Sequence, residues 1–219
     1  MIGFIVQKYS EAVGLLGNVS GLKQYSIASK AVFEGKLGYQ KIVLVISGKG
    51  KVNAAMATQM LLDNFPKVKL VINFGLISAI NKKLIMGNPY IVKRVIQTDY
   101  NISNRDDTLG LMEEYESNLP LIANKYTELI KDESVGINVA TQDANIKKND
   151  IKALEKLEID AIDMEVGSIM QVCKLNRIPA ISFKGINNYA GSEEPNSEKY
   201  VNIALSHLLT TIENLLGLL

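Results

Sequence analysis

The chain has 219 residues, 47% of them hydrophobic, and its 24 Lys and Arg residues against 23 Asp and Glu residues leave a formal charge of +1. This balance lacks the basic excess that a nucleic-acid-binding surface needs, so it favours a small or neutral ligand. The length suits one large hydrophobic core, and we expect a single domain over residues 1–219.

The cysteine content and the terminal sequence indicate the compartment. Cys173 is the only cysteine, which excludes a disulfide framework and a cysteine-based metal site. The apolar run at residues 2–6 has no basic segment before it, unlike a signal peptide, and no apolar run reaches the roughly 18 residues that span a bilayer. We therefore expect a cytoplasmic protein with no membrane partner and no nucleic-acid partner.

Short β-branched runs alternate with longer runs whose apolar residues recur at helical spacing. The predicted strands are residues 2–6, 41–46, 70–73, 89–95, 134–140 and 180–183, with a hairpin at 25–34. The predicted helices are residues 11–16, 51–64, 119–131, 151–157, 164–175 and 198–216. A polar stretch at 98–118 is the expected mobile or ligand-covering segment. The alternation predicts an α/β fold of three layers, α/β/α, around a central twisted mixed sheet, with ligands at the carboxyl ends of its strands.

A glycine-rich turn from Ser47 to Ala55 joins a predicted strand to a predicted helix. Glycines permit tight turning and close approach of a ligand, and the N–H groups that begin the helix suit an anion or a polar group. The turn matches neither a Walker A loop nor a dinucleotide-binding fingerprint. A plain strand-to-helix turn is the alternative.

Three further features carry polar groups. In Asp163-Met164-Glu165, a carboxylate could cap the following helix, or it could accept two hydroxyl hydrogen bonds from a ribose. Asn187 and Asn188 follow an apolar strand, where they could be ordinary turn residues. His207, the only histidine, is predicted to be a helix-surface or packing residue.

Several weak motifs occur here in a familiar order and spacing. They are residues 2–5 followed by Glu11 and Val13, the turn 47–55, Ile72-Asn73-Phe74-Gly75, Gly87 before a long strand, Asp143-Ala144 and Asp163-Met164-Glu165. Together they resemble, across nearly the whole chain, the methylthioadenosine/S-adenosylhomocysteine nucleosidases of the nucleoside phosphorylase and nucleosidase superfamily.

The resemblance implies a role for each matching residue. Glu165 would bind the ribose hydroxyls, Met164 would pack on the sugar, and Asn145 and Ile146 would contact the base. Glu11 would activate water, and Asn188 would stand at the position of the catalytic acid, where it would also face the base. The turn and the pocket wall would comprise Gly48, Lys49, Phe74, Gly75 and Leu76.

The resemblance also implies the activity. Its members hydrolyse the N-glycosidic bond of adenine thionucleosides in methionine salvage: the ribosyl group becomes cation-like, a carboxylate activates water, and an acid protonates the purine. They are usually homodimers and use no metal and no organic cofactor.

The nucleophile is predicted by comparison within the superfamily. Phosphorylases carry an arginine in the loop after the first strand and another where this chain has Asn73, whereas the first loop here is Gln7-Lys8-Tyr9. A phosphate dianion would lack its bidentate clamps. Hydrolysis is therefore favoured, although Lys8 or Lys49 could supply a substitute charge.

Three positions depart from the nucleosidase pattern. The family's catalytic acid is an aspartate in a Ser-Asp pair, and the aligned pair here is Asn187-Asn188. An asparagine cannot donate a proton as an acid. General acid catalysis of this kind contributes a factor of about 10²–10⁴ to the rate. The Gly-Ser-Ala-Gly-Gly stretch is Gly-Leu-Ile-Ser-Ala at residues 75–79, which removes a hydroxyl near the water and adds bulk. The base-stacking phenylalanine position is Asn145.

These departures leave three hypotheses open. The first is a nucleosidase of weak activity or altered base preference, including 6-oxopurines, because the 6-oxopurine-selective phosphorylases resemble this chain in using Asn at position 188. The second is a nucleoside-binding protein that has lost catalysis. The third is a purine nucleoside phosphorylase.

Overall fold

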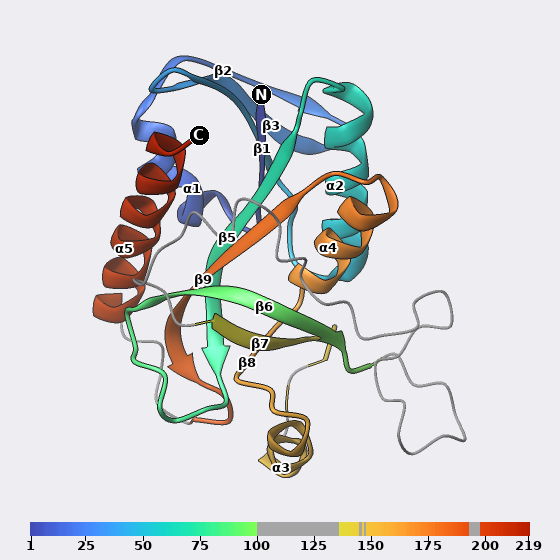
Figure 1. Cartoon of the computed structure of the whole chain (residues 1–219), viewed down its shortest axis with the longest axis vertical. Helices are drawn as coiled ribbons and strands as arrows, with labels where there is room; N and C mark the ends of the chain where they lie inside the picture. The colour runs from blue at the N-terminus through green and yellow to red at the C-terminus, as the bar shows by residue number, and fades with distance from the viewer. Residues whose placement is uncertain (100–135, 145, 147, 193–197) are drawn as a thin grey trace.

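The computed structural model describes residues 1–99, 136–144, 146, 148–192 and 198–219 (Figure 1). Its strands are β1 (Ile2–Val6), β2 (Val19–Ile27), β3 (Lys30–Leu37), β4 (Gln40–Ile46), β5 (Leu70–Ala79), β6 (Pro89–Gln97), β7 (Gly136–Thr141), β8 (Ala161–Asp163) and β9 (Ala180–Tyr189). Its helices are α1 (Tyr9–Gly17), α2 (Lys51–Asn64), α3 (Lys148–Lys156), α4 (Val166–Leu175) and α5 (Glu198–Gly217). The predicted helix at 119–131 and nearly all of the polar stretch at 98–118 lie outside the described residues.

The strands form one mixed sheet in the order β2-β3-β4-β1-β5-β8-β7-β6-β9. β1 runs parallel to both β4 and β5, whereas β3 pairs antiparallel with β2 and β4. An additional parallel pairing of β9 with β5 closes β5, β8, β7, β6 and β9 into a ring. The predicted mixed sheet is confirmed, and the ring is a feature that the sequence analysis did not predict.

Helices cover both faces of the open half of the sheet, α1 and α5 on one side and α2 and α4 on the other (Figure 1). The alternation of side chains along β1 serves both layers: Ile5 belongs to the core cluster under α2 and α4, while Phe4 and Val6 belong to the cluster under α1 and α5. This two-sided burial explains why β1 is apolar throughout. Among the described residues, no helix is long and apolar enough to cross a membrane.

The hairpin and the last strand are longer than predicted. β2 and β3 turn at Ala28 and Ser29, with φ of 47° and 67°, a left-handed turn that neither residue type signals. Asn187 and Asn188 do not form a turn after the last strand, because β9 continues to pair with β5 as far as Tyr189. His207 lies exposed on the surface of α5, where its Nδ1 is 2.8 Å from the carbonyl oxygen of Gly87, so the helix-surface alternative of the prediction is confirmed.

The packing of α5 on β9 depends on Gly185. A Cβ at this position would lie 2.8 Å from the Cβ of Ala204, which is buried in α5. We expect Gly185→Ala to lower the free energy of unfolding by about 1–3 kcal/mol through overpacking. The control is Gly14→Ala in α1, where the nearest atom is 3.5 Å away and the change should stabilise the helix by roughly 0.5–1 kcal/mol. Urea unfolding of both variants measures the contrast, and equal effects would contradict it.

Candidate active site

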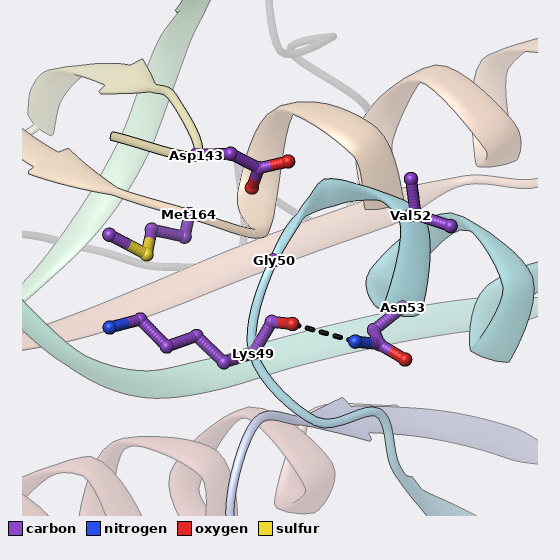
Figure 2. Close-up of a pocket in the computed structure, with 6 residues that line it drawn as sticks. All are labelled: Lys49, Gly50, Val52, Asn53, Asp143 and Met164. Atoms are coloured by element: carbon purple, nitrogen blue, oxygen red, sulfur yellow. Dashed lines mark hydrogen bonds between the residues drawn. The ribbon is translucent and has the colours of Figure 1, made fainter. Parts of the chain in front are cut away.

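A cavity of about 550 Å³ lies where β1, β5, β8 and β9 deliver polar residues. Its lining includes Gln7, Lys8 and Glu11 after β1, Lys49 before α2, Leu76, Ile77 and Ser78 of β5, Ile146, the β8–α4 junction Asp163, Met164 and Glu165, and Asn187 and Asn188 of β9. A second cavity of about 410 Å³ shares Lys49 and Met164 with it (Figure 2). The polar side chains therefore meet at the carboxyl ends of the strands, where the sequence predicted a ligand site.

Glu165 is buried at the wall of this cavity, directly before α4. Its Oε1 accepts hydrogen bonds from the side-chain amide of Gln7 and from the backbone N–H of Gly50, the latter at 3.1 Å. Within the described residues, its Oε2 accepts none. Burial, and next the charge of Asp163, raise the pKa of Glu165. The result is a buried carboxylate whose Oε2 has no hydrogen-bond donor among the described residues and can accept a hydrogen bond from a hydroxyl.

Asp163 makes different contacts from Glu165, because it bonds the start of α4 and a neighbouring strand. Its carboxylate accepts hydrogen bonds from the N–H of Val166 at 2.9 Å and from the hydroxyl of Thr141 at 2.7 Å. It also pairs with Lys184 of β9 at 3.1 Å, and both side chains are 3% exposed. Asp163 therefore makes the helix-capping contact, which leaves Glu165 free to face the cavity.

The glycine turn brings backbone N–H groups to this junction. Gly48 and Gly50 have φ of 82° and 98°, a left-handed conformation that favours glycine. The turn places the N–H of Gly50 on Glu165 and the N–H of Lys51 on Asp143, at 2.8 Å. Gly50 thus has a function beyond chain reversal, since its N–H donates a hydrogen bond to the carboxylate of Glu165.

Glu11 is the second buried carboxylate of the cavity, and it lies in the first turn of α1. Its oxygens accept hydrogen bonds from the backbone N–H groups of Leu76 at 3.2 Å and Lys8 at 3.3 Å. A Cβ at Gly75 would lie 3.0 Å from Oε2 of Glu11, so a side chain there would crowd the carboxylate. Desolvation by burial is the main influence on Glu11 and raises its pKa.

Asn188 and Ser78 meet at another part of the wall. The hydroxyl of Ser78 donates to Oδ1 of Asn188 at 2.7 Å. Ile146 lines the same cavity, and Asn145 lies outside the described residues.

Phe74 and Asn73 lie in the core. Phe74, expected in the pocket wall, does not line the cavity, because its ring packs edge-on against Phe4 with 6.1 Å between centroids. The amide of Asn73 donates to the carbonyl of Ile5 at 2.9 Å and accepts from the hydroxyl of Ser182 at 2.7 Å. The position where phosphorylases carry an arginine is therefore a buried link between β1, β5 and β9.

A family model described as the phosphorylase superfamily matches residues 3–215. The chain belongs to the phosphorylase superfamily. Similar superfamily members include 5'-methylthioadenosine/S-adenosylhomocysteine nucleosidases of Staphylococcus haemolyticus (27% identical, covering 100% of both chains) and Marinomonas sp. (28% identical, covering 99% of this chain and 98% of the relative).

Solved structures of the superfamily share the fold. The Colwellia psychrerythraea nucleosidase in complex with adenine has a TM-score of 0.89 at 24% identity and covers 99% of this chain and 94% of its own. The Neisseria meningitidis nucleosidase in complex with methylthio-immucillin-A has a TM-score of 0.87 at 20% identity and covers 100% and 99%. These likenesses confirm the predicted phosphorylase-like α/β architecture.

The raised pKa of Glu11 predicts a pH-dependent stability. A carboxyl whose pKa is higher in the folded state than its model value of 4.5 contributes stability at low pH, and this contribution is lost as pH rises through the folded-state pKa. We expect the free energy of unfolding of wild type, relative to Glu11→Gln, to fall as pH rises from about 4.5. Urea unfolding of both proteins across a pH series measures the difference. A difference that is constant with pH, or that grows in favour of wild type, would contradict the assignment.

Proposed function

We propose that the protein is a nucleosidase that hydrolyses the N-glycosidic bond of a purine nucleoside or thionucleoside, such as methylthioadenosine or S-adenosylhomocysteine. The observation that carries the proposal is a pair of buried carboxylates in one cavity: Glu165, whose Oε2 has no donor among the described residues, and Glu11, which backbone N–H groups hold. The full-length similarity to nucleosidases supports the same reaction.

Glu165 binds the ribose in this proposal. Its free Oε2 accepts a hydrogen bond from a ribose hydroxyl, and Met164 offers its thioether to the sugar from the adjacent position of the same cavity wall. The interactions of Oε1 with Gln7 and Gly50 hold the carboxylate in place before the ligand arrives.

Glu11 activates the water. Burial raises the pKa of Glu11, which strengthens the carboxylate as a proton acceptor. As the bond between C1′ and the base nitrogen breaks, its electron pair leaves with the base, and the ribosyl group becomes cation-like. Water attacks C1′ and transfers a proton to Glu11.

Water is the nucleophile rather than phosphate. Asn73 cannot hold a phosphate because both ends of its amide are engaged in the core. Lys8 and Lys49 line the cavity, but a lysine offers a point charge and not the bidentate geometry that grips an oxyanion.

Position 188 provides no general acid to protonate the base as it leaves. Asn188 can donate a hydrogen bond to the base but cannot release a proton. The hydroxyl of the nearby Ser78 is also too weak an acid to protonate the leaving base. We therefore infer slow turnover of adenine nucleosides, by the factor of roughly 10²–10⁴ that a general acid contributes.

Substitution of Glu165 tests its proposed contact with the ribose. We expect base release from methylthioadenosine or inosine to be independent of added phosphate, and Glu165→Gln to reduce kcat/KM by about 10²-fold or more, because an amide cannot replace a charged acceptor of a ribose hydroxyl. A coupled assay of free base, with and without phosphate, measures both effects. Phosphate-dependent release would establish a phosphorylase, and binding without release by wild type would establish a non-catalytic nucleoside-binding protein.

Substitution of Asn188 tests the missing acid. Asn188→Asp supplies a carboxyl at the base end, and we expect kcat for methylthioadenosine to rise about 10-fold or more. Asn187→Asp, one position earlier in β9, is the matched control and should not produce this gain. No gain in Asn188→Asp would show that the base departs with a proton from elsewhere.

We also propose that the protein is a cytoplasmic homodimer that serves methionine salvage. Exposed apolar side chains on α2 support the dimer: Val52 is 79% exposed and Met56 38% exposed, and Val52 also lines the second cavity (Figure 2). Burial of such side chains is a common source of homodimer affinity.

Sedimentation velocity tests the dimer. We expect wild type to sediment as a dimer and Val52→Glu to shift toward monomer, because a charge would be buried at the interface. Tyr39→Glu, a fully exposed position in the β3–β4 turn, is the matched control and should stay dimeric. A monomeric wild type would overturn this proposal.

A further inference from the structure

Lys8 and Lys49 are two charged side chains of the larger cavity that the proposed reaction does not use. Both are exposed, so they lie at its mouth. The parallel pairing of β1 with β4 continues past the strand ends, where the N–H of Gly48 donates to the carbonyl of Gln7 at 3.1 Å. Lys8 and Lys49 are the next residues of these two segments, so the backbone brings two positive charges to the same edge of the sheet.

Among the described residues, neither ammonium group has an ion-pair or hydrogen-bond partner. The carboxylates of the cavity are held by other groups: Asp163 pairs with Lys184, and Glu11 accepts backbone N–H groups. Lys8 acts on Glu11 through its charge, which opposes the larger rise in pKa that burial causes. Two neighbouring like charges repel each other, and an anion bound between them would relieve this repulsion.

The two lysines flank the carboxylate that binds the ribose in the proposed reaction. Oε1 of Glu165 accepts the side-chain amide of Gln7 and the N–H of Gly50. Lys8 follows Gln7 directly, and Lys49 directly precedes Gly50. The positive charges therefore enter the cavity from the two segments that hold Glu165, and they lie beside the bound sugar.

The second cavity places Lys49 more closely. Lys49 and Met164 line both cavities, and Figure 2 shows the Lys49 side chain extended toward the side on which Met164 lies, away from Val52 and Asn53. Asp143 also lines the second cavity, but its Oδ1 accepts the N–H at the start of α2 and it makes no ion pair with Lys49 within the described part of the chain. The ammonium group is thus directed to the sugar side of the site.

The parts of a bound nucleoside leave one position for an anion. In the proposed reaction Glu165 takes the ribose hydroxyls, Glu11 faces C1′ and Asn188 faces the base. The substituent on C5′ has no assigned partner, and Lys8 and Lys49 are the charges without an assigned ligand. A phosphate monoester carries a charge of about −1.5 to −2 at pH 7, which matches two ammonium groups.

We propose that Lys8 and Lys49 are specificity-determining residues that bind a phosphate on C5′, so that the preferred ligand is a purine nucleoside 5′-monophosphate. This inference rests on the proposed binding of the ribose at Glu165. The ester bond to the ribose already fixes the position of such a phosphate, so two point charges are sufficient to hold it. An attacking phosphate must instead be oriented by the protein alone, for which lysines lack the bidentate geometry.

Dissociation constants for adenosine and its 5′-monophosphate, and for inosine and its 5′-monophosphate, test the inference. Each pair shares its base and its ribose, so the ratio within a pair reports on the phosphate alone. Calorimetry is done on Glu11→Gln protein, in which the proposed hydrolysis is stopped. We expect each nucleotide to bind about tenfold or more tightly than its nucleoside, as charge-assisted hydrogen bonds allow. Lys8→Gln and Lys49→Gln should each reduce this ratio, and the double variant should bring it close to one.

Two control variants separate a local contact from the net charge of the protein. Lys49→Arg keeps the positive charge and should keep the preference for nucleotides. Lys67→Gln removes the same charge from an exposed position just before β5, at the end of this strand opposite to the cavity-lining Leu76 and Ser78. It should leave both ratios unchanged.

The outcomes separate this inference from the proposed function. Equal affinity for nucleoside and nucleotide, or a ratio that the lysine variants leave unchanged, overturns the inference even if wild type releases base. A preference for nucleotides that the double variant abolishes supports it even if wild type releases no base, which would overturn the nucleosidase alone. Failure to bind any of the four ligands overturns both.

Two further measurements test other anions at the same lysines. Phosphate-dependent release of base from inosine that Lys49→Gln abolishes would assign the lysines to an attacking phosphate, and it would overturn both proposals. A lysine-dependent preference for S-adenosylhomocysteine over methylthioadenosine, without a preference for nucleotides, would assign them to a carboxylate and overturn the phosphate site alone.

Discussion

The ion pair between Asp163 and Lys184 ties the β8–α4 junction to β9 in the interior of the protein, with each side chain 3% exposed. Two charges are removed from water here, and such a pair persists only if its remaining hydrogen-bonding capacity is used. Thr141 and the N–H of Val166 complete the bonding of Asp163. Because Asp163 takes the capping contact and the lysine, Glu165 two residues later is left to face the cavity. Lys184 also lowers the electrostatic cost of the two cavity carboxylates, opposing the rise in pKa that burial causes in Glu11 and Glu165.

The closed ring of strands explains why residues distant in sequence meet. β5 pairs with β1 along its first residues and with β8 at its end, while β9 accompanies it along nearly its whole length. Glu11, Ser78, Glu165 and Asn188 consequently line one cavity. The site depends on this strand pairing more than on any local motif.

The sequence predicted the elements better than their contacts. Helix α2 was predicted with its observed bounds, because its helical pattern is stopped by Pro66. Glu11, Met164 and Glu165, which the family resemblance named as site residues, all line the cavity. Nothing in the local sequence distinguishes the capping role of Asp163 from the cavity-facing carboxylate of Glu165, since both precede the same helix.

The hydrogen bonds of Gln7 and Ser78 were not predicted, because they join residues 158 and 110 positions apart in the chain and depend on the strand register. Lys184 did carry a signal, as a lysine inside the apolar run of β9.

In the proposed reaction, Glu165 receives the ribose while Glu11 faces the water that attacks C1′. A crystal structure of Glu11→Gln protein with bound inosine tests it most directly. We expect a ribose hydroxyl within hydrogen-bond distance of Oε2 of Glu165, an ordered water between position 11 and C1′, and the base against Asn188. A nucleoside bound with its ribose away from Glu165, or with C1′ remote from position 11, would rule out these roles for the two carboxylates.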